Sequence, residues 1–211
     1  MKNRINILGF GDLGKQLYYF LSQNKKNNFN FFDDNLFKKK EKNSYAFSEY
    51  SNPIFKENKF IVALGYHHLK KKYEIVNQLL LLKRKVFSFV HPTVFINKSS
   101  FIAHGAFIYP MCNIDKEVSI ANGVLLNNSV CISHSSIIGE CSYVSPGVII
   151  SGNVVIGSRT FIGSGVVISN NVVIGNDVKI GIGTVVTKNI PDNCSVIGNP
   201  CKILKKDLRL I

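Results

Sequence analysis

One histidine of this chain lies among polar residues whose chemistry suits proton transfer. His134 is surrounded in the sequence by three serines and preceded by two asparagines: Asn127, Asn128, Ser133, Ser135 and Ser136. An imidazole is the side chain best suited to take a proton near neutral pH. His134 is therefore a candidate general base, and an exposed histidine without a catalytic role is the alternative.

The other four histidines carry weaker signals. His67 and His68 begin a lysine-rich segment and are expected to face solvent. His91 precedes Pro92, where a structural role is favoured, and His104 is expected to be exposed.

A glycine-rich loop suits phosphate binding. Residues 9–14 read GFGDLG, a G-x-G-x-x-G match between an apolar strand at 5–8 and a helix at 15–22. Backbone N–H groups at the start of such a helix receive phosphate oxygens. Asp33 and Asp34 follow the next expected strand, at 29–32, where they could accept hydrogen bonds from a ribose or base. A tight turn that needs glycine for its own conformation is the alternative.

The length of this first region decides between nucleotide ligands. A strand at 60–64 that ends at Gly65, a helix at 67–82 and a strand at 86–90 complete it. About 90 residues hold little more than one βαβ unit, whereas a dinucleotide is clasped by two mononucleotide-binding halves. We therefore predict a small Rossmann-like α/β domain over residues 1–90 that binds one nucleotide.

The second half of the chain follows a period of six residues. The residues at this spacing are all aliphatic: Ile96, Ile102, Ile108, Ile114, Ile120, Leu126, Ile132, Ile138, Val144, Ile150, Ile156, Ile162, Ile168, Ile174, Ile180 and Val186. The residue four positions after each is small or β-branched. A period of six fits neither a helix nor an isolated strand. It is typical of a solenoid of short parallel strands in which three hexapeptides form one triangular coil.

The repeat predicts a left-handed parallel β-helix over residues 91–211, ending in a C-terminal tail. The aliphatic residue of each hexapeptide is expected to point inward, so His134, two residues after Ile132, should leave a corner of its coil. His91, His104 and His134 are too far apart along the axis of this solenoid to bind one ion together, so no metal is expected.

Composition bears on location and partners. The chain has 211 residues, of which 45% are hydrophobic and 18% charged, as in a globular protein. No apolar run approaches the roughly 20 residues that span a bilayer, and no signal peptide is recognised, so we expect a cytoplasmic protein without membrane insertion. The five cysteines form no C-x-x-C pair and are expected to be reduced thiols.

The net charge of +13 raises the question of nucleic acid. Its lysines cluster at 38–42, 70–72 and 205–206 without interleaved aromatic residues, so no nucleic-acid partner is expected. A basic surface also suits polyphosphate ligands such as nucleotide-sugars and coenzyme A.

Two stretches carry a resemblance to a known family. NNSVCISHSSIIGE at 127–140 and GIGTVVTKNIPDNCSVIGNPCKIL at 181–204 resemble the sialic acid O-acetyltransferases (NeuD-type) and nucleotide-sugar N-acetyltransferases (PglD-type), which are hexapeptide-repeat acyltransferases. The resemblance covers nearly the whole chain, including the glycine loop and the aspartate pair. It implies a homotrimer with active sites between adjacent solenoids, a nucleotide-sugar on the N-terminal domain and acetyl-CoA along the later coils.

The resemblance also implies roles for individual residues. His134 matches the general base, and Ser135 stands where the family usually has an acidic residue that orients the base. The coenzyme is implied at Tyr143, Gly152, Ser164, Gly181 and Gly183. The nucleotide-sugar is implied at Gly9, Gly11, Asp12, Asp33, Asp34, Gly65, Tyr66 and Asn127. Leu13 and Tyr66 stand where the family usually has a histidine and an asparagine.

The activity that the resemblance implies is metal-free, acetyl-CoA-dependent N-acetylation of a UDP- or dTDP-linked deoxy-amino sugar for surface-glycan biosynthesis. Two alternatives stay open. One is O-acetylation of a sugar such as sialic acid, and the other is a non-catalytic trimeric solenoid that binds a nucleotide-sugar.

Overall fold

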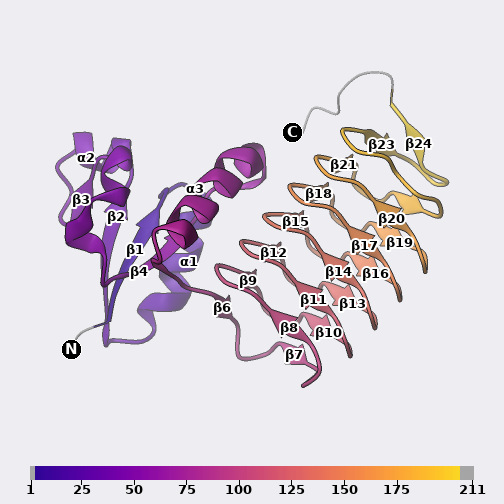
Figure 1. Cartoon of the computed structure of the whole chain (residues 1–211), viewed down its shortest axis with the longest axis horizontal. Helices are drawn as coiled ribbons and strands as arrows, with labels where there is room; N and C mark the ends of the chain where they lie inside the picture. Colours follow the sequence, from indigo (N-terminus) through magenta and orange to yellow (C-terminus); the bar gives the residue numbers. More distant parts are fainter. Residues whose placement is uncertain (1–2, 205–211) are drawn as a thin grey trace. The chain divides into compact units, whose positions relative to one another are not determined.

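The computed structural model describes residues 3–204, and the chain divides into two compact units, Met1–Phe87 and Ser88–Ile211. The first unit is an α/β fold and the second a left-handed β-helix (Figure 1), so the predicted fold class is confirmed. The lysines at 205–206 and the end of the predicted tail lie outside the described residues. No helix in the described part of the chain is long and apolar enough to cross a membrane.

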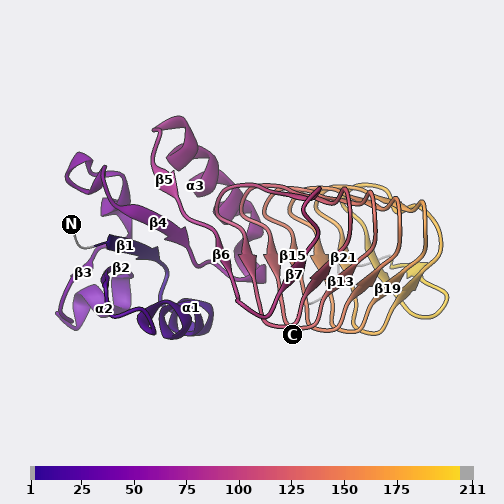
Figure 2. The same ribbon diagram turned by 90° about the horizontal axis from the view of Figure 1, so that it is seen from below.

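A parallel sheet with the strand order β3-β2-β1-β4-β5 forms the first unit. Its strands are β1 (Asn3–Leu8), β2 (Asn27–Phe32), β3 (Ser44–Tyr45), β4 (Lys59–Val62) and β5 (Lys85–Val86). The helices α1 (Asp12–Ser22) and α3 (Leu69–Leu81) lie on opposite faces of the sheet, as Figure 2 shows. Each helix buries an apolar stripe, which includes Leu17 and Leu21 in α1 and Ile75 and Leu79 in α3.

The region between β2 and β4 holds elements that the sequence did not predict. They are the helix α2 (Asp34–Lys38), strand β3 and the 3-10 turns η1 (Phe47–Ser51) and η2 (Pro53–Phe55). A third 3-10 turn, η3 (Tyr66–His68), leads into α3. These elements are too short to show a hydrophobic period in the sequence.

The predicted strand at 86–90 is wrong, because the chain leaves one sheet and joins another within it. Val86 pairs with Phe60 of β4 in the first unit, whereas β6 (Phe89–Val90) pairs with β9 (Phe107–Ile108) in the second. The intervening residues form no strand. The mostly apolar run at 86–90 therefore gives no sign in the sequence that the chain passes from one unit to the other.

The β-helix consists almost entirely of two-residue strands. After β6 and β9 they are β7 (Phe95–Ile96), β8 (Phe101–Ile102), β10 (Asn113–Ile114), β11 (Ser119–Ile120), β12 (Leu125–Leu126), β13 (Cys131–Ile132), β14 (Ile137–Ile138), β15 (Tyr143–Val144), β16 (Ile149–Ile150), β17 (Val155–Ile156), β18 (Phe161–Ile162), β19 (Val167–Ile168), β20 (Val173–Ile174), β21 (Lys179–Ile180), β22 (Val185–Val186), β23 (Ser195–Ile197) and β24 (Lys202–Ile203).

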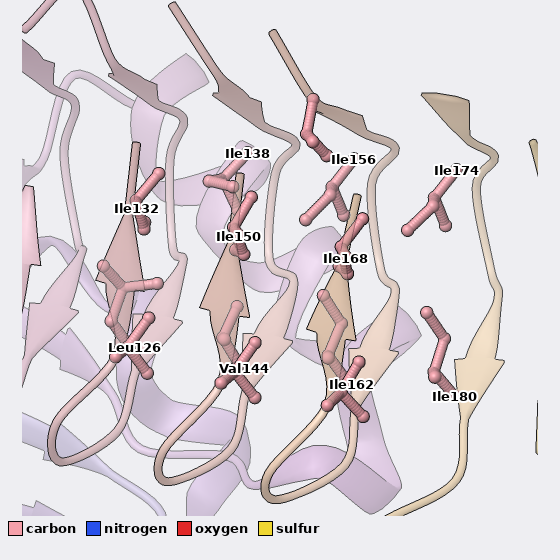
Figure 3. Packing of buried hydrophobic residues seen from close by; sticks show 14 of the residues in the cluster. Leu126, Ile132, Ile138, Val144, Ile150, Ile156, Ile162, Ile168, Ile174 and Ile180 are labelled. Carbon is pink, nitrogen blue, oxygen red and sulfur yellow. The ribbon is translucent and has the colours of Figure 1, made fainter. Parts of the chain in front are cut away.

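These strands stack into three sheets around one core. The sheets have the orders β22-β19-β16-β13-β10-β7, β20-β17-β14-β11-β8 and β24-β23-β21-β18-β15-β12-β9-β6, and we call them the six-, five- and eight-stranded sheets. From β6 to β22 each strand residue pairs with the one eighteen positions away, as Ile132 does with Ile150 and Ile150 with Ile168, whereas Lys179 of β21 pairs with Ser195 of β23, sixteen positions away. Figure 3 shows these isoleucines stacked inside the coils. Burying each one contributes about 1.5–3 kcal/mol.

All the aliphatic positions predicted from the repeat fall on the second residue of a strand, from β7 to β22. The small positions between them include buried hydroxyls. Ser136 shows how these are satisfied: its Oγ donates to the carbonyl of Ser151 at 2.9 Å and accepts from the N–H of Val154 at 3.1 Å. Ser100, Ser142 and Thr160 repeat the same pair of bonds. A buried hydroxyl with both bonds made carries no desolvation penalty.

Two of the corners between sheets matter for the site. We call the corner that follows the six-stranded sheet the His134 edge, and the corner that follows the eight-stranded sheet the Asn127 edge. The third residue of many corners has a positive φ, which glycine adopts freely. Here non-glycine residues also adopt it, including Ser135 with φ 58° and Asn153 with φ 58°.

Candidate active site

The His134 edge stacks one residue from each coil at the same corner position. The order along the edge is Lys116, His134, Gly152 and Asn170. Backbone hydrogen bonds join successive corners: the N–H of Asn153 donates to the carbonyl of His134, and the N–H of Asn171 to that of Gly152, both at 3.0 Å. The corner is therefore a rigid ladder on which His134 is mounted.

His134 packs its ring against the next coil. A Cβ atom added at Gly152 would lie 2.6 Å from Nε2 of His134 and 2.7 Å from Cε1, so only a glycine leaves room for the ring in this position. The imidazole is partly exposed and makes no hydrogen bond with any other described residue. Its position is set by packing, with a nitrogen left available for proton transfer.

Ser135 turns its hydroxyl to the preceding coil. Its Oγ donates to Oε2 of Glu117 at 3.0 Å, and its N–H donates to the carbonyl of Lys116 at 3.0 Å. A carboxylate thus lies next to Ser135, although no hydrogen bond within residues 3–204 joins it to the imidazole of His134. Sequence reasoning missed Glu117, although the eighteen-residue period of the coil points to it.

Asn170 approaches the same glycine from the following coil. Its Oδ1 accepts the N–H of Gly152 at 2.8 Å. Gly152 therefore has the ring of His134 on one side and the amide of Asn170 on the other. Asn170 was also missed from the sequence, and it too lies eighteen residues from a predicted site residue.

Asn127 lies on the other edge and holds an aromatic residue. Its Nδ2 donates to the Oη of Tyr143 at 3.2 Å, and the ring of Tyr143 stacks on Phe161 with centroids 5.8 Å apart. These side chains place one predicted sugar-binding residue and one predicted coenzyme-binding residue in direct contact.

Three further predicted coenzyme residues, Ser164, Gly181 and Gly183, also lie on the Asn127 edge. The N–H of Gly183 donates to the carbonyl of Ser164 at 2.9 Å, and both residues are exposed. Gly183 has φ +64°. Gly181 is buried, and a Cβ there would lie 2.9 Å from Cγ1 of Ile197. The backbone conformation of Gly183 and the close approach of Ile197 to Gly181 therefore favour glycine at both positions, independently of the predicted binding of the coenzyme.

The predicted residues of the β-helix fall on two different edges of one chain. His134 and Gly152 lie at one end of the strands of the six-stranded sheet, and Asn127, Ser164 and Gly183 lie at the other. A single chain does not bring His134 and Asn127 together.

The glycine loop of the first unit lies at a topological switch point. The chain runs from β1 to β2 on one side and later places β4 on the other side of β1, so the loops after β1 and β4 diverge. Ligands of open α/β sheets bind in the crevice at such a point. A Cβ at Gly9 would lie 3.2 Å from the carbonyl oxygen of Ala63, which places the two loops side by side.

The glycines around this switch point are under different structural constraints. A Cβ at Gly14 would lie 2.3 Å from the carbonyl oxygen of Gly9, so Gly14 lets α1 pack on the loop. A Cβ at Gly11 or at Gly65 would have nothing within 4 Å, and neither residue has a positive φ. The space beside Gly11 and Gly65 leaves room for a ligand next to the backbone, beside the half-buried Tyr66.

The aspartates that follow β2 accept hydrogen bonds from backbone N–H groups of the first unit. Asp33 accepts the N–H of Phe10 with Oδ2 at 2.9 Å and caps α2 with Oδ1 through the N–H groups of Asn35 and Leu36. Asp34 accepts the N–H of Phe47 at 2.9 Å. Asp33 therefore fixes the glycine loop, while Asp12 is exposed at the start of α1.

The other predicted features are placed as follows. His67, His68 and His104 are exposed, and Nδ1 of His91 is 2.9 Å from Oγ1 of Thr93 at the start of the β-helix. Within residues 3–204, no group of three or more histidines, cysteines or acidic residues is arranged to hold a metal ion.

One family of sequences matches the repeat. The bacterial transferase hexapeptide (six repeats) matches residues 135–170, which extend from the corner of His134 to that of Asn170. A search of curated proteins finds no match to the sequence.

Solved structures match nearly the whole chain. The acetyltransferase domain of PglB from Neisseria gonorrhoeae has a TM-score of 0.84 and 24% identity, over 96% of this chain and 100% of that one. PerB from Caulobacter crescentus, in complex with CoA and GDP-perosamine, has a TM-score of 0.82 and 20% identity, over 96% and 97%. WeeI from Acinetobacter baumannii has a TM-score of 0.68 and 20% identity, over 95% and 99%. The chain thus has the fold of hexapeptide-repeat acetyltransferases that carry an N-terminal α/β unit.

Proposed function

We propose that this protein is an acetyl-CoA-dependent N-acetyltransferase that acts on the amino group of a nucleotide-linked deoxy-amino sugar. The observation that carries the proposal is the placement of His134, a partly exposed imidazole fixed against Gly152, directly before the transferase repeat at residues 135–170. Further support comes from the shared fold, since PglB has been solved with acetyl coenzyme A and PerB with CoA and GDP-perosamine.

The residues of the site account for a direct transfer. The amine nitrogen attacks the thioester carbonyl carbon, and the carbonyl electron pair moves to oxygen as the C–N bond forms. His134 takes the proton that the nitrogen loses. The oxyanion then collapses, the C–S bond breaks, and the thiolate of coenzyme A takes the proton from His134. General-base help is typically worth about 10² to 10⁴-fold, and holding amine and thioester together contributes through positioning.

The nucleotide part of the substrate is proposed to bind on the first unit. The crevice beside Gly11 and Gly65 would hold the nucleotide, with phosphates at the N-terminus of α1. UDP or dTDP is the nucleotide that the family resemblance favours, and GDP belongs in any test because PerB was solved with GDP-perosamine. The product would serve surface-glycan biosynthesis in the cytoplasm.

A homotrimer would complete the site. Because His134 and Asn127 lie on different edges of one chain, they can meet only if the Asn127 edge of a second copy faces the His134 edge of the first. Apolar side chains exposed on the five- and six-stranded sheets support such packing, among them Phe101 at 64%, Ile137 at 47% and Ile149 at 47% exposure. Sedimentation analysis should give three times the chain mass of 23.6 kDa.

The test is acetyl-CoA turnover with a panel of UDP-, dTDP-, GDP- and CMP-linked amino sugars. We expect an alkali-stable amide product with at least one of them and a loss of about 10² to 10⁴-fold in His134→Ala. His104→Ala is the matched control, because His104 is also an exposed corner histidine but lies on another edge. Wild-type turnover by His134→Ala would refute the base assignment.

Other outcomes of the same test separate the alternatives. An alkali-labile ester would identify an O-acetyltransferase. Thermal stabilisation by a nucleotide-sugar without any stabilisation by coenzyme A would identify a non-catalytic binding protein.

A further inference from the structure

The oxyanion of the proposed reaction needs a hydrogen-bond donor close to His134. The ring of His134 packs against Gly152, but the N–H of Gly152 already donates to Oδ1 of Asn170 at 2.8 Å. A donor engaged in this way is not free to bind a thioester oxygen. The side chain that engages it is therefore the next group to consider.

The contact with Gly152 fixes the orientation of the Asn170 amide. Because the backbone N–H of Gly152 is a donor, the atom that faces it must be the amide oxygen. The NH2 group of Asn170 is therefore not engaged by Gly152. The side chain is exposed, and Nδ2 makes no hydrogen bond within residues 3–204.

Equivalent asparagines on another edge use their NH2 groups within the coil. Asn122 and Asn176 each accept an N–H from the preceding coil through Oδ1, at 3.1 and 2.8 Å. Their Nδ2 atoms then donate to a carboxylate of the following coil, to Glu140 at 2.9 Å and to Asp192 at 3.3 Å.

Asn170 has no such acceptor above it. The coil beyond Asn170 is two residues shorter, since Ile174 pairs with Ile190, and its corner carries Lys188, an exposed cation that can only donate. On the His134 edge, the next coil after Asn170 therefore carries a positive charge. On the other edge, the next coil carries a carboxylate that accepts from the asparagine.

We propose that the Asn170 side-chain amide donates to the thioester carbonyl oxygen of acetyl-CoA and stabilises the oxyanion formed when the amine attacks. This inference rests on the proposed function. His134 and Asn170 approach Gly152 from the preceding and following coils, so a thioester beside Gly152 can present its carbon to an amine near Nε2 and its oxygen to Nδ2. Asparagine side chains serve as oxyanion donors in other acyl-transfer sites.

The decisive variant is Asn170→Asp, which keeps an acceptor for the N–H of Gly152 but removes both donors. We expect its kcat to fall about 10² to 10³-fold, with little change in the melting temperature. Asn189→Asp is the matched control, because Oδ1 of Asn189 likewise accepts an N–H, that of Val173, at 2.8 Å. This control should keep wild-type turnover.

A binding measurement tests the contact without an acceptor sugar. Calorimetry with acetyl-CoA and with CoA should show a loss of about two- to tenfold in Asn170→Ala for acetyl-CoA, the expected weight of one hydrogen bond, and no loss for CoA, which lacks the carbonyl. Wild-type kcat in Asn170→Asp, or equal losses for both ligands, would overturn the role of Asn170 while leaving the proposed function intact. A wild-type protein inactive with every sugar of the panel would overturn the proposed function, and the role of Asn170 with it.

Discussion

The imidazole of His134 rests on the α-carbon of Gly152, the residue one coil further along the same edge, with Nε2 2.6 Å from where a Cβ would stand. The position of this candidate base is therefore set by packing against Gly152 and not by a hydrogen bond to another side chain. It also gives Gly152 a reason to be glycine that does not depend on a ligand.

Replacing Gly152 by alanine should therefore displace the base. Gly152 has no positive φ, so alanine is compatible with the backbone and the melting temperature should change little. The added methyl must push the ring of His134 aside, and we expect kcat to fall at least about tenfold. In a His134→Ala background the same change should cost nothing further, because there is no ring to displace. Additive losses in the double variant would contradict this explanation.

Placing an acid at position 135 should destabilise the coil. Ser135 donates to Glu117 at 3.0 Å, so Ser135→Asp brings two carboxylates together at neutral pH. We expect the free energy of unfolding to fall by about 0.2–1 kcal/mol, and 1 M salt to reduce this loss. Glu117→Gln added to Ser135→Asp should restore it. Equal stability of Ser135→Asp and wild type in denaturant titrations would show that the two side chains do not interact.

Two glycines of the first loop should respond differently to alanine. Gly14→Ala places a Cβ 2.3 Å from the carbonyl oxygen of Gly9 and should lower the melting temperature. Gly11→Ala meets no atom within 4 Å and should leave the melting temperature unchanged. If the crevice binds the nucleotide, Gly11→Ala should nevertheless lose most of the thermal stabilisation by the nucleotide-sugar. Full ligand stabilisation of Gly11→Ala would place the nucleotide elsewhere.

The thiol of Cys112 should make the fold sensitive to alkali. Burial raises the pKa of Cys112 to about 11 from 9.0, and its Sγ donates to the carbonyl of Asn127 at 3.0 Å. Between these values the unfolded chain loses the proton before the folded one, so stability falls as pH rises from about 9 to 11. The loss attributable to this thiol is about 1–3 kcal/mol. Cys112→Ser keeps the donor without the titration, and denaturant titrations should show a smaller alkaline loss in this variant than in wild type.

The period of six explains how much of the fold could be predicted. Every aliphatic position from Ile96 to Val186 is explained by one geometric rule, so the β-helix and the outward corner position of His134 followed from the sequence. The α/β unit followed less completely. The apolar run at 86–90 hides a change of sheet, because hydrophobicity does not record which strand is the partner.

The contacts of the site depend on neighbours in space. Glu117 and Asn170 reach Ser135 and Gly152 only because the coil closes every eighteen residues, and their own sequence surroundings carry no sign of it. Asp33 is the opposite case: it was recognised from its position after β2, but its bonds to Phe10 and α2 depend on how the loop folds. Local patterns predicted the elements, and the stacking of coils decided which residues meet.

The eighteen-residue coil also restricts how this protein can change in length. Inserting or deleting one hexapeptide between His134 and Gly152 would move Gly152 and Asn170 onto a different side of the triangle and separate the histidine from them. The last coil, beyond Asn170, is two residues shorter and still buries Ile190, which pairs with Ile174. Only a whole coil can be gained or lost while Lys116, Gly152 and Asn170 keep their alignment with the base, so natural variants and engineered versions should differ in steps of one full turn.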